Sequence, residues 1–391
     1  MEDILYHQVQ PENQKTQYKQ NDSIDMVLSF EGRSLICNSV RLEADLVVNS
    51  TGVTPIDGTT DVKTDAHIGG HSVCQSWTVQ FQSQGVVENL SDYPRYVKRV
   101  SDSSKTDNDY LNSDMVAELR SPHPTIQSKV ILPRCPKEYG GDNSNTDNTT
   151  VKQTVVTANR PTQSLENPDF SIKPLICLNK VVSANQRLSY EQTGAIKISV
   201  VLERNLGVLW GRGVDANHNY ALENVRMCYM SAPDQKPQQV EMVSTLGLKN
   251  SLTSATSNIA SKVPAVADSM AMSFLRQDQE YALNYNNVAL QKIPNLDKIS
   301  FMFNDSTNTY QSFELLSAEE QLSRGLEGLK GKTRNAMELT KLSSNEAYIL
   351  GLNWFSDVDL SNQKFNININ SDISNLEPFI AYLYFNSKVL V

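Results

Sequence analysis

The sequence predicts an all-β protein whose strands are numerous enough for two eight-stranded β-sandwiches. Short segments in which apolar and polar residues alternate recur along most of the 391-residue chain, and this period of two is typical of strands buried on one face. Asparagine is abundant, at 35 residues, and amide side chains suit the turns and polar rims of sheets. Stretches with helical periodicity are few, so an all-β fold is favoured over a mixed one.

The predicted strands follow one another from residue 24 to the last residue. Within segment 33–48, Leu42 and Leu46 share one face while charged residues occupy the other, which indicates a half-buried strand. Segment 364–370 has the most regular alternation and places Ile367 in a sheet interior. We expect about sixteen strands in all. Besides these two, the segments with a strand pattern span residues 24–30, 72–82, 126–132, 170–178, 195–203, 221–229, 239–246, 266–275, 281–290, 298–303, 310–315 and 378–391.

Helices are predicted only in the connections between strands. Ser317 and Glu320 have the spacing of a capping box, and leucines follow at helical intervals, which predicts a helical insertion over residues 317–342. Segment 86–100 is expected to be a short helix or an ordered loop. Residues 134–165 and 249–262 are polar and predicted to be exposed loops.

The expected domain organisation has three parts. Residues 1–20 are rich in glutamine, lack periodicity and are predicted to form a flexible N-terminal arm. Residues 21–205 are expected to form the first sandwich, with the polar loop 134–165 inside it. Residues 206–391 are expected to form the second sandwich, with the helical insertion 317–342.

Charge and composition exclude several classes of protein. The chain carries 35 Lys and Arg against 44 Asp and Glu, a net charge of -9, which argues against a general nucleic-acid binder. No apolar run reaches the roughly 18 residues that span a bilayer, and the N-terminus has no signal-peptide core. The odd number and wide spacing of the cysteines predict reduced thiols and no disulfide framework: Cys37, Cys74, Cys135, Cys177 and Cys228.

A search for catalytic and ligand-binding motifs assigns no site. His67 and His71 have helical metal-ligand spacing, but two glycines separate them, so a loop before a strand is the favoured interpretation. The Asp- and Asn-rich segment 142–148 offers oxygen ligands without the pattern of a calcium loop. Segment 211–213 has only the start of a dinucleotide-binding loop. We therefore expect no catalytic residues, no cofactor, no metal and no enzyme activity.

Several segments resemble one viral family in their layout. Segment 69–79 with the helical 93–96 is similar to a strand and the helix after it in a first jelly roll. Segments 170–175 and 194–198 are similar to the strands that close that roll, 221–227 to the opening of a second roll, and 351–385 to its end. On these segments the chain resembles capsid proteins of the double jelly-roll lineage, which includes tailless phages, virophages and large DNA viruses.

The resemblance implies a fold, partners and a location. The fold is two jelly-roll sandwiches with a few short helices in loops. The function is that of a major capsid protein, whose homotrimers form pseudo-hexameric capsomers of an icosahedral shell. Expected partners are further copies, other capsid proteins, and an internal membrane or minor protein beneath the shell, without sequence-specific nucleic acid. The location is the virion, assembled inside the host cell.

Two other functions fit the sequence less well and stay open. A penton protein, with one jelly roll and an added domain, would form pentamers. A carbohydrate-binding jelly-roll module would need clustered exposed aromatic residues. Trp77, Trp210 and Trp354 are instead scattered, and Trp77 lies in the apolar phase of its strand.

Overall fold

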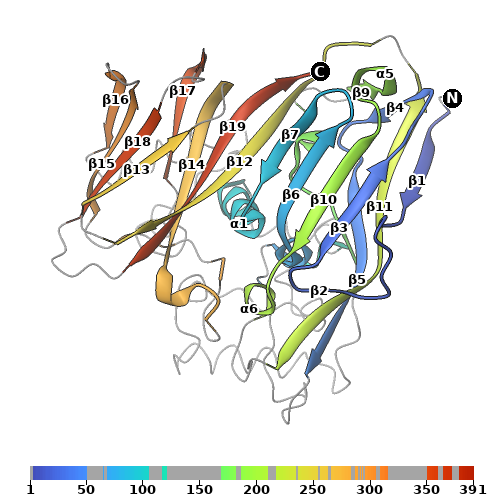
Figure 1. The fold of residues 1–391 in the computed structure, drawn as a ribbon, viewed down its shortest axis with the longest axis horizontal. Coiled ribbons are helices and arrows are strands. Elements are labelled where there is room, and N and C mark those ends of the chain that lie inside the picture. The colour runs from blue at the N-terminus through green and yellow to red at the C-terminus, as the bar shows by residue number, and fades with distance from the viewer. Residues whose placement is uncertain are drawn as a thin grey trace.

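The fold was taken from a computed structural model, and three sheets dominate it (Figure 1). The structure describes residues 3–50, 65, 68–104, 117–120, 169–181, 186–209, 217–234, 237–253, 256–262, 266–282, 287–288, 291, 293, 296–304, 309–315, 350–359, 364–371 and 378–391. No helix in this part of the chain is both long and apolar enough to cross a membrane.

The first part of the chain contributes eleven of the labelled strands. They are β1 (Leu5–Val9), β2 (Tyr18–Lys19), β3 (Ser23–Leu28), β4 (Arg33–Ile36), β5 (Arg41–Ser50), β6 (Cys74–Phe81), β7 (Gly85–Leu90), β8 (Asp169–Ile172), β9 (Arg187–Ser189), β10 (Ile196–Leu202) and β11 (His218–Pro233). The helices are α1 (Tyr93–Ser104), α5 (Tyr190–Thr193) and α6 (Asn205–Val208), with 3₁₀ turns at Gly69–Val73 and Cys177–Asn179.

The second part contributes the remaining described strands. They are β12 (Glu241–Leu252), β13 (Thr256–Lys262), β14 (Val266–Arg276), β15 (Leu296–Asn304), β16 (Thr309–Leu315), β17 (Leu350–Asp359), β18 (Lys364–Ser371) and β19 (Phe379–Leu390), with a 3₁₀ turn at Gln277–Gln279. They form two facing groups, in the orders β17-β14-β19-β12 and β13-β18-β15-β16. One apolar core, which includes Phe301, Ile367 and Phe385, lies between these groups. These strands form the second sandwich.

The first sandwich likewise consists of two layers of strands around an apolar core. One layer is β7-β6-β10-β3, and the other is the seven-stranded sheet β8-β5-β11-β4-β9, with β1 and β2 also paired to β11. A second apolar core contains Trp77 and Phe81 of β6. In both sandwiches the first strand of one layer pairs with the last one: β3 with β10, and β12 with β19. This interleaved order is the mark of a jelly roll, and two rolls lie side by side in the chain.

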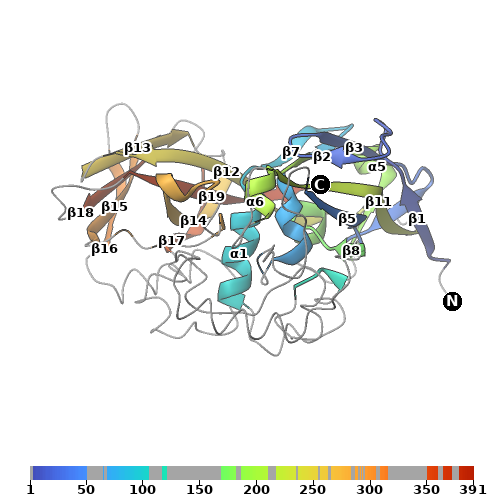
Figure 2. The ribbon, with the colours of Figure 1, turned by 90° about the horizontal axis from the view of Figure 1, so that it is seen from below.

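One eight-stranded sheet runs through both sandwiches. Its two halves meet where β7 pairs with β12 in parallel through one register pair, Asn89 and Leu246. Helix α1 lies below this sheet, between the two halves (Figure 2). Strand β19 is buried on both faces, because Leu383 and Phe385 point into the second core while Tyr382 and Tyr384 point toward α1. This double burial explains the continuous apolar run at the end of the sequence.

The all-β fold with two jelly rolls is confirmed, and so is the strand phase around Ile367, which is fully buried. The loop predicted over 249–262 is wrong, because β12 continues to Leu252 and β13 begins at Thr256. Its Ser, Thr and Asn residues pair with the Asn-rich β18, as Asn258 does with Asn368. Segment 86–100 contains β7 and the start of the twelve-residue helix α1.

The strand predicted over 281–290 is wrong for the described residues 281, 282, 287 and 288, which lie in or beside turns after a 3₁₀ turn. The flexible arm is also wrong for residues 5–9 and 18–19, which form β1 and β2 on β11. Strand β11 pairs with β5 and β4, so pairing favours a boundary after Pro233 instead of at 205/206. Segments 126–132, 134–165, 142–148, 211–213 and 317–342 lie outside the described residues.

Candidate functional site

Helix α1 packs on both sandwiches. The contact region between them, made by this helix and by the meeting of β7 with β12, is called the joint below. Tyr93 belongs to the first core, where its ring centroid lies 5.7 Å from that of Trp77. The Arg95 guanidinium lies 4.1 Å from the centroid of the Tyr382 ring in β19, a cation–π contact. The Tyr384 hydroxyl donates to the backbone oxygen of Asp92 at 2.9 Å. The helix thus ties the first core to the lower face of the second sandwich.

Three basic residues of α1 are buried in this joint, although basic side chains usually face water. Lys98 lies 3.1 Å from the carboxylate of buried Asp65. Arg99 donates to the backbone oxygen of Leu350 in β17. Arg95 donates to the amide oxygen of Asn287 at 3.0 Å. Buried charges need such partners, so these contacts fix the helix against both halves of the chain.

A buried ion pair lies where β7 meets β12. Glu88 and Lys180 are joined at 2.7 Å, and their side chains are 0% and 1% exposed. The same carboxylate accepts the backbone N–H groups of Thr245 at 2.9 Å and Cys177 at 2.5 Å. Burial alone would lower the pKa of Lys180, but the charge and hydrogen bond of Glu88, together with nearby Tyr96 and Cys177, outweigh burial and the pKa is raised. The lysine is therefore charged in the folded protein, and its charge is balanced.

Hydrogen bonds continue from this ion pair into the second sandwich. Lys180 donates to the Thr245 hydroxyl at 2.7 Å, and that hydroxyl lies 3.0 Å from the amide oxygen of Asn386 in β19. The Asn386 amide then donates to the Ser269 hydroxyl of β14 at 3.1 Å. This series of hydrogen bonds runs from Lys180 into strands β12, β19 and β14 of the second sandwich. A buried hydrogen-bond network of this kind favours one arrangement of the two sandwiches relative to each other.

His71 does not serve as a metal ligand in this arrangement. The Tyr93 hydroxyl accepts the Leu175 N–H at 3.0 Å and is hydrogen-bonded to Nδ1 of His71 at 2.7 Å. The other ring nitrogen of His71, Nε2, lies 3.2 Å from the carboxylate of Glu118, so both ring nitrogens have protein partners. Burial lowers the pKa of His71. No cluster of possible metal ligands occurs among the described residues, which do not include His67.

Glu118 is the acidic centre of a buried polar cluster that also contains His71, Tyr93 and Arg120. Burial alone would raise its pKa, but the nearby His71 and Arg120 outweigh burial and lower it to about 2. Arg120 lies 3.0 Å from the carboxylate, and the Lys173 N–H donates to it at 3.0 Å. The cluster joins the 3₁₀ turn at Gly69–Val73 to segment 117–120 and the end of β8, so its role is structural.

The predicted reduced thiols agree with the described cysteines. Cys37, Cys74, Cys177 and Cys228 are free and buried, and burial raises the pKa of Cys37 to about 12. A thiol with so high a pKa is a poor nucleophile at neutral pH. Cys135 lies outside the described residues.

The N-terminal segment 3–19, called the strap below, covers the open side of the first sandwich. Strands β1 and β2 pair with the edge of β11 in one layer. Between them, the Glu12 N–H donates to the Asp25 backbone oxygen of β3 in the other layer at 2.8 Å. The strap therefore protects edges of both sheets, and exposed edges are sites of unwanted pairing. No long alternation of apolar and polar residues indicates the strap in the sequence, because most of its side chains are polar.

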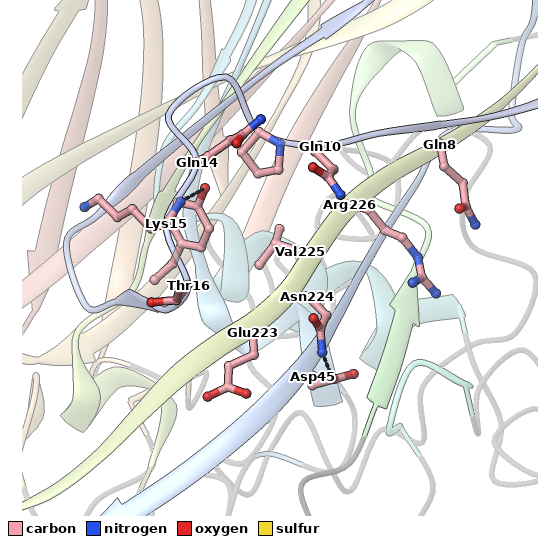
Figure 3. A pocket seen from close by; sticks show the side chains of 12 residues that line it. Gln8, Gln10, Gln14, Lys15, Thr16, Asp45, Glu223, Asn224, Val225 and Arg226 are labelled. Carbon is pink, nitrogen blue, oxygen red and sulfur yellow. Dashed lines mark hydrogen bonds between the residues drawn. The ribbon is translucent and has the colours of Figure 1, made fainter.

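A polar pocket of about 950 Å³ lies between the strap and β11 (Figure 3). The register of β11 on β5 shifts between Glu223 and Arg226, and Asn224 has a positive φ of 50°. The Asn224 amide donates to the Asp45 carboxylate at 2.6 Å. The Gln17 amide donates to Glu223 at 2.6 Å. Because the lining residues Asp45, Glu223 and Asn224 already have hydrogen-bond partners within the chain, the pocket is interpreted as space left under the strap and not as a formed ligand site.

Comparison with known proteins gives the same architecture. No protein-family model and no curated protein matches the sequence. A chain of the Sputnik virophage structure superposes with a TM-score of 0.60 at 8% identity, covering 99% of this chain and 86% of that one. The major capsid protein of Faustovirus gives 0.56 at 8% identity, covering 99% and 90%. The chain has the double jelly-roll fold. The mavirus major capsid protein, at 7% identity, gives a TM-score of 0.50 and covers 97% and 86%.

Proposed function

We propose that this chain is a viral capsid protein that assembles with copies of itself into an icosahedral shell. The observation that carries the proposal is a double jelly roll, matched over 97–99% of the chain by structures that include two major capsid proteins. The joint supports the same role. A shell subunit needs its two sandwiches to keep a fixed arrangement. The buried Glu88–Lys180 pair and helix α1 connect the two sandwiches.

The oligomer we propose is a homotrimer. Each chain supplies two sandwiches, so three chains around an axis supply six and give a capsomer with a hexagonal outline. The pentameric penton alternative expects one jelly roll plus an added domain of another kind. Two rolls with the same interleaved strand order favour the trimer.

The proposed partners and location follow from this role. The protein would lie in the virion shell, beside other capsid proteins and above an internal membrane or minor protein. Its net charge of -9 fits a shell that does not coat the genome directly. A structural role is favoured over an enzymatic one because two proteins with the same fold, from Faustovirus and mavirus, are major capsid proteins. The carbohydrate-binding alternative has less support, because Trp77 is fully buried.

Native mass spectrometry of the purified protein tests the proposal. A dominant species at three times the 43.7 kDa chain mass is expected. A species at five times that mass would support the penton alternative. A protein that stays monomeric at high concentration, under conditions where related shells assemble, would contradict a shell function. Glycan-array binding by that monomer would support the carbohydrate-binding alternative.

A further inference from the structure

Strand β1 forms an open edge of the molecule. In the described part of the chain it pairs with β11 alone, so its outer backbone groups face away from the sheet. Figure 1 shows β1 at the outer end of the first sandwich, remote from the second sandwich and from the joint. A row of free N–H and C=O groups on such a strand is a template for another strand.

This edge lacks the devices that usually protect one. Native edges carry charged side chains, prolines or bulges. Residues 4–10 contain no Asp, Glu, Lys, Arg or Pro, and Pro11 is the first of these to follow. The single titratable side chain with a basic form, His7, has a pKa lowered by partial burial and by nearby Arg33. The strand is therefore uncharged at neutral pH.

Apolar side chains gather on the same edge. Ile4, Leu5 and Tyr6 are 49%, 42% and 58% exposed, and Met230, directly opposite Tyr6 on β11, is 39% exposed. Together they make up most of the large apolar side chains that are exposed in the described residues. Large exposed apolar side chains that cluster, instead of lying singly, mark a surface that another surface covers.

The net charge of the chain indicates which kind of partner covers the β1 edge. Copies of a chain with a net charge of -9 repel one another over most of their surfaces. An uncharged apolar strand edge is a place where two copies approach without that repulsion. Asp3, just before the edge, is already paired with Arg33 at 3.2 Å. The edge thus fits a second copy of this chain better than a strongly charged partner.

We propose that β1 pairs with β1 of a second copy, antiparallel and around a two-fold axis at His7. This register sets Tyr6 of each copy opposite Gln8 of the other, and Leu5 opposite Val9, so no charged residue of the strand meets another one. The contact is isologous, because the same patch serves both copies. It joins the two seven-stranded sheets into one continuous sheet across the pair. The inference rests on the proposed function, since it assigns a contact between capsomers, but its test reads this contact alone.

Cross-linking at the axis tests the proposal. In an antiparallel pair, directly opposed residues have Cβ atoms about 4.5–5.5 Å apart, within reach of a disulfide or a short bis-maleimide. His7→Cys should therefore give a covalent dimer of full-length chains in the assembled protein. Cys135→Ser provides the background, and the other native cysteines are buried. Residue 7 faces Tyr229 within its own chain, so no thiol competes there.

A matched pair of lysine variants shows whether the edge itself makes the contact. Tyr6→Lys places a charge beside the axis in each copy and should reduce the covalent dimer of the His7→Cys protein by about tenfold or more, a change of about 1.4 kcal/mol or more in the free energy of the contact. Val86→Lys changes an equally exposed apolar residue of β7, 60% exposed, and should leave the dimer unchanged.

The outcomes separate the contact from the shell function. Covalent dimers that Tyr6→Lys removes and Val86→Lys preserves support the proposal. Shells that assemble normally from trimers without covalent dimers would overturn the β1 contact and leave the shell function standing. Equal loss in both lysine variants would also overturn it, because the effect would then follow total charge. A chain that never self-associates would overturn the shell function itself.

Discussion

Replacing Ile367 with aspartate tests the strand phase on which the second sandwich depends. Ile367 is fully buried in β18, where it lies opposite Ile259 of β13 and Phe301 of β15. Removing a side chain of this size from a core costs about 2–5 kcal/mol. A carboxylate in the same place adds several kcal/mol of desolvation, or must take up a proton to avoid it. The sum approaches the roughly 5–15 kcal/mol by which a typical domain is stable.

The control lies one residue away in the same strand. Asn368 points to the opposite face of β18 and is only partly buried, so Asn368→Asp should change the unfolding free energy by no more than about 0.5 kcal/mol. Urea unfolding followed by circular dichroism measures both variants, and native mass measures their oligomers. Ile367→Asp should fail to fold its second sandwich and fail to assemble. A soluble Ile367→Asp protein that assembles, or an Asn368→Asp protein that is the worse folder, would refute the assigned strand phase.

Three more predictions concern the joint and the turn beside α1. Glu88→Gln should lower the unfolding free energy by roughly 3–5 kcal/mol, because the charge of Lys180 then stays buried without its counter-ion; in urea titrations, adding Lys180→Met should recover part of the loss. The pKa of Glu118 falls from its ordinary 4.5 to about 2 on folding, so this group stabilises the fold above pH 4.5 and loses that effect as the pH falls toward 2. Thermal unfolding of Glu118→Gln should show a weaker acid dependence over that interval, and an unchanged dependence would count against the assignment. Gly69→Ala should destabilise strongly, since residue 69 has a φ of 48° and its Cβ would overlap backbone atoms, whereas Gly85→Ala, at a φ of 80° with open space around it, should cost about 1 kcal/mol.

Alternation predicted the parts of the fold in which one face of a strand meets a core. Strand β10 has the buried and half-buried pattern that its sequence predicts, and Ile367 is buried as expected. The same rule missed β13, where Ser, Thr and Asn fill positions that pair with an asparagine-rich neighbour. It also missed the strap, because β1 is held by the backbone of β11 and keeps most of its side chains exposed.

The joint could not be predicted from the sequence, for a different reason. Its contacts connect positions far apart in the chain, because Glu88 and Lys180 are 92 positions apart and Glu88 and Thr245 are 157 positions apart. No local motif encodes such a pair. The available hint was charge inside helix α1, where Lys98 and Arg99 interrupt an otherwise core-facing segment and are both buried. A charged residue in such a segment predicts that it has a polar partner elsewhere in the fold, but not which residue that partner is.

Electron microscopy of the assembled protein tests the central claim most directly, because it shows whether chains with two sandwiches each assemble side by side into a shell. We expect capsomers with a hexagonal outline, in which each of three chains supplies two upright sandwiches. Dispersed single chains at every concentration, or particles in which each chain contributes one sandwich to a five-fold ring, would contradict it.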